Sequence, residues 1–329
     1  MRHEVIENLY DIIDEMTLLL VEHANMGYLD ALCAIGENIV NADVLQEVEM
    51  EIEIKLFQLG KRLNEVEFDV EEVRKALQLA LLKGLKADYI ALDALTPDSI
   101  ALLVGHLIVK LNKHVQNLSI ADFTVGTGNL LTAVLNTLGE VPKEIYGVDV
   151  DYKMLEVSKM MANMQDYDVS FHHQSSARRM AVPKVDIIIG DLPSSGNADA
   201  ADLDSQLAQK GCNYLPYLLI ENHLNYLNED GYAIYVINNN FFSQNFAPDL
   251  HNILTDKAEI GMLLQLPEGL FKEKINQKSI LVLKKPGKEF TKVKEVLVGN
   301  FPEFGNIEGF RTMLTKIENW VIINRWARN

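Results

Sequence analysis

Cysteine, basic charge and long apolar runs are all scarce in this sequence of 329 residues. Its two cysteines, Cys33 and Cys212, are far apart, which excludes a disulfide framework and a cysteine-based zinc cluster. No uninterrupted apolar run approaches the roughly 20 residues that span a bilayer. The N-terminus is acidic and amphipathic, without the apolar segment and cleavage site of a signal peptide. We therefore expect a cytoplasmic protein that does not enter a membrane.

Basic residues are too few for a protein that grips nucleic acid by itself. The formal net charge is -17, and residues 1–90 hold 19 acidic against 8 basic side chains. Proteins that bind DNA alone usually carry a basic stripe that displaces phosphate counterions. This chain has only short basic clusters, such as Arg178-Arg179 and Lys284-Lys285. We expect any binding to DNA to be weak without a partner.

The first 90 residues have the pattern of helices. Apolar residues recur at helical spacing from Val5 to Leu20, and no strand alternation appears before residue 90. Asp69 and Glu72 match an N-cap and its capping partner for a helix that ends at Gly84. We predict an acidic helical domain over residues 1–90, which could cap the rest of the chain or pair two copies of it as a homodimer. Phosphate mimicry by the acidic face is the alternative.

From about Leu118 onward, short apolar runs alternate with amphipathic segments, which is the signature of βαβ units on a parallel sheet. The predicted strands cover residues 119–123, 145–149, 168–172, 185–190, 232–237, 262–266 and 279–283. Helices are predicted at residues 129–138, 153–164, 216–227 and 250–255. The expected fold class is α/β, with a doubly wound, seven-stranded, Rossmann-like sheet over residues 91–329.

A glycine-rich turn after the first predicted strand is the clearest candidate site. Asp122 ends that strand, and Gly126 and Gly128 let the backbone approach a ligand at the start of a helix with free N–H groups. Asp149 ends the second strand, where a carboxylate can accept both ribose hydroxyls of an adenosine. A dinucleotide fold would have a third glycine where Leu131 stands, and the Asp122 carboxylate would repel a pyrophosphate. The pattern favours a cationic adenosine ligand, as S-adenosylmethionine is.

These segments resemble the class I S-adenosylmethionine-dependent methyltransferases, and more narrowly the adenine-specific DNA methyltransferases related to the methylation subunit of type I restriction-modification systems. The resemblance covers roughly residues 88–286. Further matching segments are Leu95–Ile100 (LTPDSI), residues 185–194 (VDIIIGDLPS), and residues 265–271 (QLPEGLF) with the strand that follows. The resemblance implies methyl transfer from S-adenosylmethionine to an amino nitrogen, with the exocyclic amine of adenine in DNA as the expected acceptor.

The resemblance also assigns roles to individual residues. The matching cofactor-binding positions are Thr96, Pro97, Asp122, Thr124, Gly126, Gly128, Asp149, Val150 and Ser175. The catalytic loop corresponds to Asp191, Leu192 and Pro193. In this loop, the Asp191 side chain and the Leu192 carbonyl would accept hydrogen bonds from the two N–H groups of the target amine and so favour its pyramidal form. Substrate contacts fall on Ser194 and Phe271.

Two positions depart from the family pattern. Ser194 stands where the family has an aromatic ring that stacks on the flipped base, a contact worth roughly 1 to 3 kcal/mol, and Phe271 is the other ring that could stack. Gln174 and Ser175 stand where an acidic residue usually lies near the adenine amino group of the cofactor. Two alternatives therefore stay open. One is a catalytically degenerate S-adenosylmethionine-binding regulatory or scaffold protein, and the other is a methyltransferase of RNA, protein or a small amine.

The remaining candidate residues point to structure rather than chemistry. His172 and His173 are adjacent on a predicted strand and face opposite sides, so we expect no metal site. Tyr214 and Tyr217 fit the buried face of a helix, and residues 238–242 fit a turn that ends a strand. Few residues follow the last matched strand, so we expect recognition of a DNA sequence to come from a partner subunit or from the N-terminal helices, or to be absent.

Overall fold

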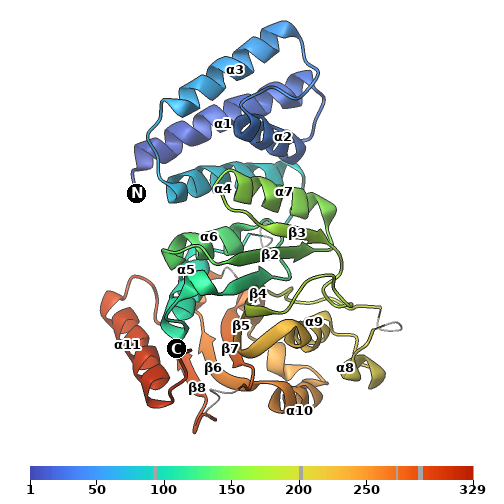
Figure 1. Ribbon diagram of the computed structural model, residues 1–329, viewed down its shortest axis with the longest axis vertical. Coiled ribbons are helices and arrows are strands. Elements are labelled where there is room, and N and C mark those ends of the chain that lie inside the picture. Colours follow the sequence, from blue (N-terminus) through green and yellow to red (C-terminus); the bar gives the residue numbers. More distant parts are fainter. Residues whose placement is uncertain (92–94, 200–202, 272, 288–291, 329) are drawn as a thin grey trace. The chain divides into compact units, whose positions relative to one another are not determined.

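The computed structural model describes residues 1–91, 95–199, 203–271, 273–287 and 292–328 (Figure 1). The chain forms two compact units. The first unit contains Met1–Ala101, Val125–Thr137 and Asp151–Phe171. The second unit contains Leu102–Thr124, Leu138–Val150 and the chain from His172 onward. The domain boundary that the sequence suggests near residue 90 stays a prediction.

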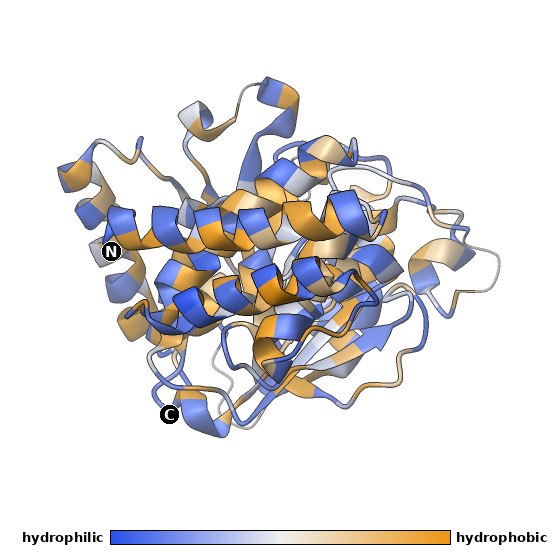
Figure 2. Cartoon of the chain, turned by 90° about the horizontal axis from the view of Figure 1, so that it is seen from above, coloured by the Kyte–Doolittle hydropathy of each residue, from blue (hydrophilic) through white to orange (hydrophobic). Residues whose placement is uncertain are grey.

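Amphipathic helices build the first unit. They are α1 (His3–His23), α2 (Tyr28–Asn41), α3 (Met50–Asn64), α4 (Val70–Ala87) and α7 (Tyr152–Asn163), together with most of α6 (Asn129–Leu138). Their ribbons alternate hydrophilic and hydrophobic segments (Figure 2), and the apolar sides of α1 to α4 and α7 form one buried core. In the described part of the chain no single helix is long and apolar enough to cross a bilayer. Within the same described residues, α1 and α2 meet the length and composition criterion when the two helices, bent by 118°, are counted together.

The predicted start of α4 is confirmed and its predicted end is wrong. The Asp69 side chain accepts a hydrogen bond from the Glu72 N–H, and Glu72 accepts one from the Asp69 N–H, which together form a capping box. The helix does not end at Gly84 but continues to Ala87. A Cβ atom at Gly84 would lie 2.4 Å from Leu29 Cδ2. The glycine therefore allows α2 and α4 to approach each other and does not mark a helix end.

An eight-stranded sheet organises the second unit, in the order β3-β2-β1-β4-β5-β7-β6-β8 (Figure 1). Its strands are β1 (Ser119–Asp122), β2 (Glu144–Asp149), β3 (Ser170–His173), β4 (Val185–Asp191), β5 (Leu227–Asn238), β6 (Glu259–Gln265), β7 (Lys278–Lys284) and β8 (Leu297–Asn300). β1 pairs in parallel with β2 and β4, and β4 pairs in parallel with β5. β7 runs antiparallel to both β5 and β6. This is the predicted doubly wound α/β architecture.

The sheet has one strand more than predicted. All seven predicted strands are present, and β8 is added beside β6 in parallel. β8 has four residues at the sheet edge, and only Leu297 among them is buried. A strand this short and exposed has too few apolar residues to be predicted from the sequence pattern. The helices associated with the sheet are α5 (Asp98–Leu111), α8 (Gln206–Gln209), α9 (Leu215–His223), α10 (Ala247–Lys257) and α11 (Ile307–Ile323).

Candidate functional site

Three of the predicted site residues end neighbouring strands at one edge of the sheet. Asp122 is the last residue of β1, Asp149 of β2 and Asp191 of β4, and β1 lies between the other two strands. In the strand register, Asp122 is opposite Gly147 on β2 and Ile189 on β4. The carboxyl ends of parallel strands form the ligand-binding edge of doubly wound sheets. The structure therefore gathers these carboxylates at the edge where a ligand is expected.

Asp122 is a buried carboxylate with only half of its hydrogen-bonding capacity used inside the protein. The residue is only 1% exposed to solvent. Its Oδ1 atom accepts hydrogen bonds from the Thr124 N–H at 3.0 Å and from the Thr124 hydroxyl at 3.4 Å. Oδ2 is buried and has no hydrogen-bond partner among the described residues. Burial raises the pKa of Asp122 to about 7; the Thr124 N–H opposes this rise, and the charges of Asp149 and Asp191 add to it. A buried oxygen in this condition is costly without a ligand and suits a cationic one.

Gly190 explains how the turn after β1 lies so close to β4. A Cβ atom at this position would be 2.8 Å from Thr124 Oγ1 and 3.6 Å from Asp122 Oδ1. Glycine is therefore required for the Thr124 hydroxyl to reach Asp122. Gly190 could not be identified as a site residue from the sequence, because a glycine near the end of a strand does not indicate which turn lies against it.

Asp191, unlike Asp122, has a protein cation beside it. Lys278 Nζ lies 2.6 Å from Asp191 Oδ1, and both side chains are only 11% exposed. Lys278 is the first residue of β7 and is opposite Asn238 in the antiparallel register with β5. Sequence reasoning missed this residue. The available signal was its place at the start of the antiparallel strand, which returns the chain to the edge where β4 and β5 end.

The loop after Asp191 is held by backbone pairing on both of its sides. The Leu192 N–H donates to the Val236 carbonyl at 3.0 Å, and the Leu192 side chain is buried. Farther along, the Leu215 N–H donates to the Gly196 carbonyl at 2.9 Å. Pro193 and Ser194, between these anchors, are half-buried. The backbone carbonyl of Leu192 is thus presented from a fixed position at the end of β4.

An aromatic side chain contacts position 194 from another part of the chain. The Tyr214 hydroxyl donates to the Ser194 carbonyl at 3.4 Å, and the Tyr214 ring packs edge-on against Tyr217 with centroids 4.9 Å apart. Tyr217 is fully buried and donates to the Phe241 carbonyl, as expected of a core residue. Tyr214 is only half-buried, so its interpretation as a core residue is incomplete.

The other edge residues form a wall beside β5. The predicted turn after β5 is present, with the Asn240 N–H donating to Asn238 Oδ1 at 3.0 Å. Asn238 Nδ2 donates to the Ile275 carbonyl at 2.6 Å, and the Ser279 hydroxyl donates to Asn239 Oδ1 at 2.6 Å. Phe271 follows a short 3-10 helix, Glu268–Leu270, and is half-buried.

The segment after β3 also carries a polar side-chain atom that has no partner among the described residues. The Gln174 N–H donates to the Asp149 carbonyl at 3.0 Å, and Gln174 Oε1 accepts from the Ala181 N–H at 3.1 Å. Gln174 Nε2 is buried and lacks a partner among the described residues. Ser175 is half-buried beside it, and Val150 is exposed. A donor without a partner so close to Asp149 fits a ligand that offers an acceptor, such as a ring nitrogen of adenine.

The first unit holds the remaining predicted residues, beginning with Thr96. The Thr96 carbonyl accepts a hydrogen bond from Asn129 Nδ2 at 2.7 Å, and Asn129 Oδ1 accepts one from Arg74 Nη1 at 2.8 Å. Arg74, on α4, is fully buried and also pairs with Asp98 at 2.9 Å and Glu71 at 2.6 Å. Arg74 therefore fixes both the segment Thr96–Asp98 and the start of α6. No sequence pattern linked it to a segment more than twenty residues away.

The glycine-rich turn has the backbone that its sequence predicts. Gly126 and Gly128 adopt φ values of 52° and 77°, in the left-handed region that favours glycine. A Cβ atom at Gly128 would lie 2.9 Å from Ser158 Cβ and 3.0 Å from Ser158 Cα. Gly128 therefore also lets α6 begin in contact with α7. Pro97, the last predicted residue of this unit, accepts from the Ile100 N–H at the start of α5.

The residues described include no group of three or more His, Cys, Asp or Glu side chains arranged to hold a metal ion. His173 Nε2 lies 3.0 Å from the Val150 carbonyl, and the His172 ring stacks on Tyr146. Both imidazoles thus have ordinary contacts within the protein.

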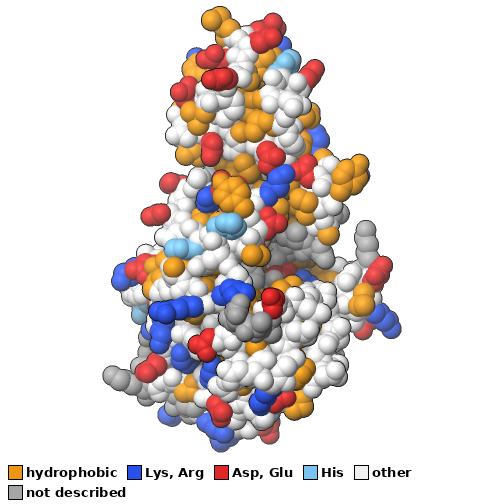
Figure 3. All heavy atoms as spheres, turned by 90° about the vertical axis from the view of Figure 1, so that its right-hand side faces the viewer, with side chains coloured by type: hydrophobic (Ala, Val, Ile, Leu, Met, Phe, Trp, Pro, Cys, Tyr) orange, Lys and Arg blue, Asp and Glu red, His pale blue; other side chains and the backbone are white. Residues whose placement is uncertain are grey.

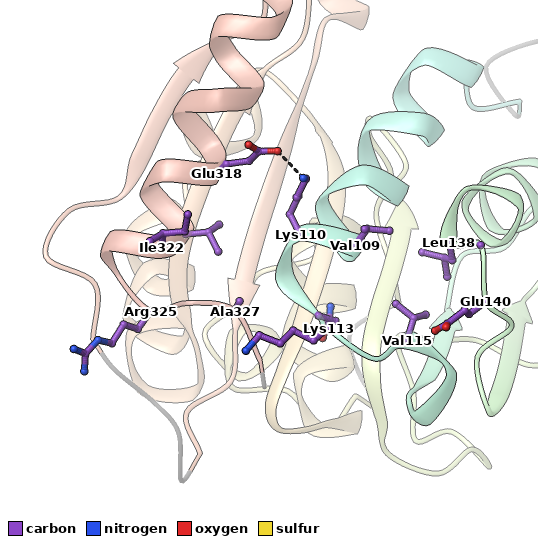
Figure 4. A pocket seen from close by; sticks show the side chains of 13 residues that line it. Val109, Lys110, Lys113, Val115, Leu138, Glu140, Glu318, Ile322, Arg325 and Ala327 are labelled. Carbon is purple, nitrogen blue, oxygen red and sulfur yellow. Dashed lines mark ion pairs between the residues drawn. The ribbon is translucent and has the colours of Figure 1, made fainter.

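A concave region lies at the opposite, amino edge of the sheet (Figure 4). This groove of about 880 Å³ is crossed by an ion pair between Lys110 and Glu318 at 2.6 Å. Val115, just before β1, and the segment Leu138–Glu140, before β2, form one wall. Because doubly wound sheets bind their ligands at the carboxyl edge, this groove is not the candidate active site.

Comparison with known proteins gives two matching families. Residues 93–327 match the N-6 DNA methylase family, and residues 7–85 match the YtxK N-terminal helical domain. The uncharacterized protein YtxK of Bacillus subtilis (strain 168) is 30% identical over 325 residues, which cover 97% of this chain and 98% of YtxK.

Solved structures agree with this match. A Listeria monocytogenes protein assigned to the class I S-adenosylmethionine-dependent methyltransferases has a TM-score of 0.86 and 31% identity, covering 97% of this chain and 99% of that one. The type I restriction-modification methyltransferase subunit of Streptococcus thermophilus shares the fold, with a TM-score of 0.59 and 14% identity over 95% of this chain and 78% of that one. The chain therefore belongs to the N-6 DNA methylase family of methyltransferases.

Proposed function

We propose that this protein transfers a methyl group from S-adenosylmethionine to the exocyclic amine of adenine in DNA. The observation that carries the proposal is the row of carboxylates at the ends of β2, β1 and β4. At its centre is the buried Asp122 Oδ2, which has no hydrogen-bond partner among the residues that the structure describes. Membership of the N-6 DNA methylase family supports both the reaction and the acceptor. A cytoplasmic location, where cofactor and DNA occur together, is part of this proposal.

The described residues fit S-adenosylmethionine in the charge and polarity that they offer. Asp122 Oδ2 offers a buried negative charge, which suits the ammonium and sulfonium groups of the cofactor. Asp149 ends β2, where a carboxylate can accept both ribose hydroxyls, and nearby Gln174 Nε2 offers a donor that no described residue uses. Bound S-adenosylmethionine would supply an electrophilic methyl group. The cofactor roles of Thr96, Pro97, Thr124, Gly126, Gly128, Val150 and Ser175 rest on the family resemblance.

The loop Asp191-Leu192-Pro193 would orient the acceptor. The exocyclic amine of adenine is a poor nucleophile because its lone pair is delocalised into the ring. The Asp191 carboxylate and the Leu192 carbonyl would accept hydrogen bonds from its two N–H groups and thereby favour the pyramidal amine of the transition state. Lys278 holds Asp191 Oδ1 at 2.6 Å and so positions that carboxylate before a base arrives. Because the Leu192 N–H is bonded to β5, the two acceptors have a fixed relation to each other.

Recognition of DNA requires more than these residues supply. The net charge of -17 is unfavourable for binding a polyanion. The Streptococcus thermophilus neighbour is a subunit of a type I restriction-modification system. We therefore include a specificity partner in the proposal, with Ser194 and Phe271 as the residues of this chain that contact the target base.

The same ion pair favours a second candidate function. An Asp191 carboxylate that already accepts a hydrogen bond from an ammonium is a weaker acceptor for an amine. Together with Ser194 in place of an aromatic residue, this supports a protein that binds S-adenosylmethionine for regulation or as a scaffold without transferring the methyl group. Transfer to RNA, protein or a small amine is the third possibility.

Labelled methyl transfer separates these candidates. The full chain is incubated with methyl-labelled S-adenosylmethionine and either unmethylated DNA or total RNA, and cofactor binding is measured in parallel by equilibrium dialysis. Incorporation into DNA adenine that disappears in Asp191→Ala, with cofactor affinity retained, supports the proposed function. Cofactor binding without transfer to DNA, even with a candidate partner subunit added, contradicts it and supports the second candidate.

A further inference from the structure

Helix α3 carries an exposed apolar stripe on the side opposite its buried side. Ile52, Leu56, Leu59 and Leu63 are buried in the first unit. On the other side, Met50, Ile54 and Phe57 are 76%, 51% and 50% exposed. Spacings of four and three residues place them on one side of the helix, which is the pattern of a helix that docks on a partner. Figure 3 shows hydrophobic and acidic side chains intermixed on the exterior of the helices at the top of the view.

Residues of opposite charge lie at equal distances on either side of Phe57, the centre of α3. Phe57 lies in the middle of α3, with Glu53 four residues before it and Lys61 four residues after it. Glu53 and Lys61 are both exposed. If two copies of α3 pair antiparallel across a two-fold axis at Phe57, Glu53 of one copy is opposite Lys61 of the other, and the reverse. A two-fold interface needs this kind of self-complementary surface, and the opposite charges meet twice in it.

Gly60 provides room for a side chain of the second copy. In the same antiparallel register, Ile54 of one copy is opposite Gly60 of the other, because each lies three residues from Phe57. Glycine destabilises a helix relative to alanine, and a Cβ atom at Gly60 would meet no heavy atom within 4 Å among the described residues outside its own helix backbone. Packing in the described part of the chain therefore does not require this glycine. It lies in a groove of about 270 Å³ with Phe57, Lys61 and the buried Leu56, which matches the apolar character of Ile54.

We propose that α3 is the interface of a two-fold homodimer in which the helices pair antiparallel about Phe57. The Ile54 side chain of each copy occupies the groove beside Gly60 of the other, and Glu53 pairs with Lys61 across the interface. This inference is independent of the methyltransferase proposal, since none of these residues belongs to the candidate site.

Sedimentation velocity of the full chain over a hundred-fold range of concentration tests the interface. We expect reversible dimerisation in the wild type. Glu53→Lys and Lys61→Glu should each weaken the dimer by about ten-fold or more, because each change places like charges together at two symmetric positions. The double variant Glu53→Lys/Lys61→Glu should restore dimerisation. Gly60→Leu should abolish it by filling the groove.

Matched controls separate the interface from the fold. Lys55→Glu makes the same charge change on α3 outside the proposed face and should leave the dimer unaffected. Circular dichroism and thermal unfolding should show that Gly60→Leu retains a folded first unit, because leucine forms helices better than glycine. A monomer at every concentration would overturn the proposal. So would a dimer that survives Gly60→Leu, or single charge variants that the double variant fails to rescue.

Discussion

The two units differ in whether a buried charged side chain has partners within the protein. In the first unit, the fully buried Arg74 guanidinium has partners in Glu71, Asp98 and Asn129, so its charge is neutralised and its donors are used inside the protein. In the second unit, the buried Asp122 carboxylate receives hydrogen bonds only at Oδ1, and Oδ2 has no partner among the described residues. A buried group satisfied within the protein supports the fold, whereas one left unsatisfied indicates a ligand.

Asp191 lies between these two extremes. It ends a strand at the same edge as Asp122, yet Lys278 supplies a cation at 2.6 Å. The edge therefore contains one carboxylate whose charge awaits an external partner and one whose charge is held in place by the protein. This difference is consistent with two different roles. Asp122 would bind a cationic cofactor, and Asp191 would present an oriented hydrogen-bond acceptor to the substrate.

The largest expected effect is on stability, through Arg74. Replacing Arg74 with Met removes the buried cation that pairs with Glu71 and Asp98, although Asp98 keeps its ion pair with Lys75. The free energy of unfolding should fall by about 3 kcal/mol, the lower end of the loss that follows when one partner of a buried ion pair is removed. Urea denaturation measures the change. Arg62→Met, at an exposed basic residue of the same unit, should change stability by less than about 0.5 kcal/mol. Equal losses in the two variants would mean that the Arg74 network does not support the fold.

Asp122 should show the reverse pattern, with a large effect on binding and none of the loss of stability. Asp122→Asn keeps the acceptor for Thr124 and removes the charge, so the Kd for S-adenosylmethionine should rise about 100-fold, or about 2.7 kcal/mol. At pH 8 the free energy of unfolding should not fall, because an unpaired buried charge has been removed. A variant that unfolds more easily but binds the cofactor normally would make Asp122 structural.

Lys278 tests the intermediate case. Lys278→Met removes the ammonium that lies 2.6 Å from the Asp191 carboxylate, and we expect a loss of about 2 kcal/mol in the free energy of unfolding. If methyl transfer occurs, its rate should fall while the Kd for S-adenosylmethionine stays within two-fold of the wild type. Single-turnover assays with rapid quenching measure the rate of methyl transfer, and equilibrium dialysis measures the Kd for S-adenosylmethionine. A faster transfer would show that the ion pair restrains Asp191 instead of positioning it.

The smallest effect is a pH dependence that distinguishes Asp122 from its neighbours. Since the pKa of Asp122 is about 7, the ionised form that binds a cation is lost as the pH falls, and cofactor affinity should weaken about ten-fold from pH 8 to pH 6. The pKa is raised by folding, so without ligand this group should make the protein less stable as the pH rises from about 4 to 7. Equilibrium dialysis and urea titrations check both, and Asp122→Asn should remove both. An unchanged pH profile in Asp122→Asn would assign it to another group.

The sequence predicted those parts of the fold that depend on local patterns. Apolar runs located the seven strands, and the Asp69 and Glu72 pair located the start of α4. The strand ends then placed Asp122, Asp149 and Asp191 at one edge, because the ends of parallel strands must meet there. Gly84 was misread because glycine both ends helices and allows two helices to touch, and only the position of α2 distinguishes these roles.

The partners of these residues could not be predicted in the same way. Arg74 and Thr96, or Asp191 and Lys278, meet through tertiary packing of segments that no periodicity relates. The contact of Tyr214 with position 194 depends on the pairing of two loops. The identities of the carboxylates followed from sequence, but which of them is satisfied within the protein did not, and that is the property that separates a ligand site from a structural ion pair.

A crystal structure of the full chain with S-adenosylmethionine would locate the cofactor. We expect the cofactor at the carboxyl edge of the sheet, with its cationic methionine portion beside Asp122 Oδ2 and its ribose beside Asp149. A cofactor bound elsewhere, for example in the groove beside Lys110 and Glu318, or an Asp122 carboxylate that makes no contact with it, would show that Asp122 does not bind the cofactor.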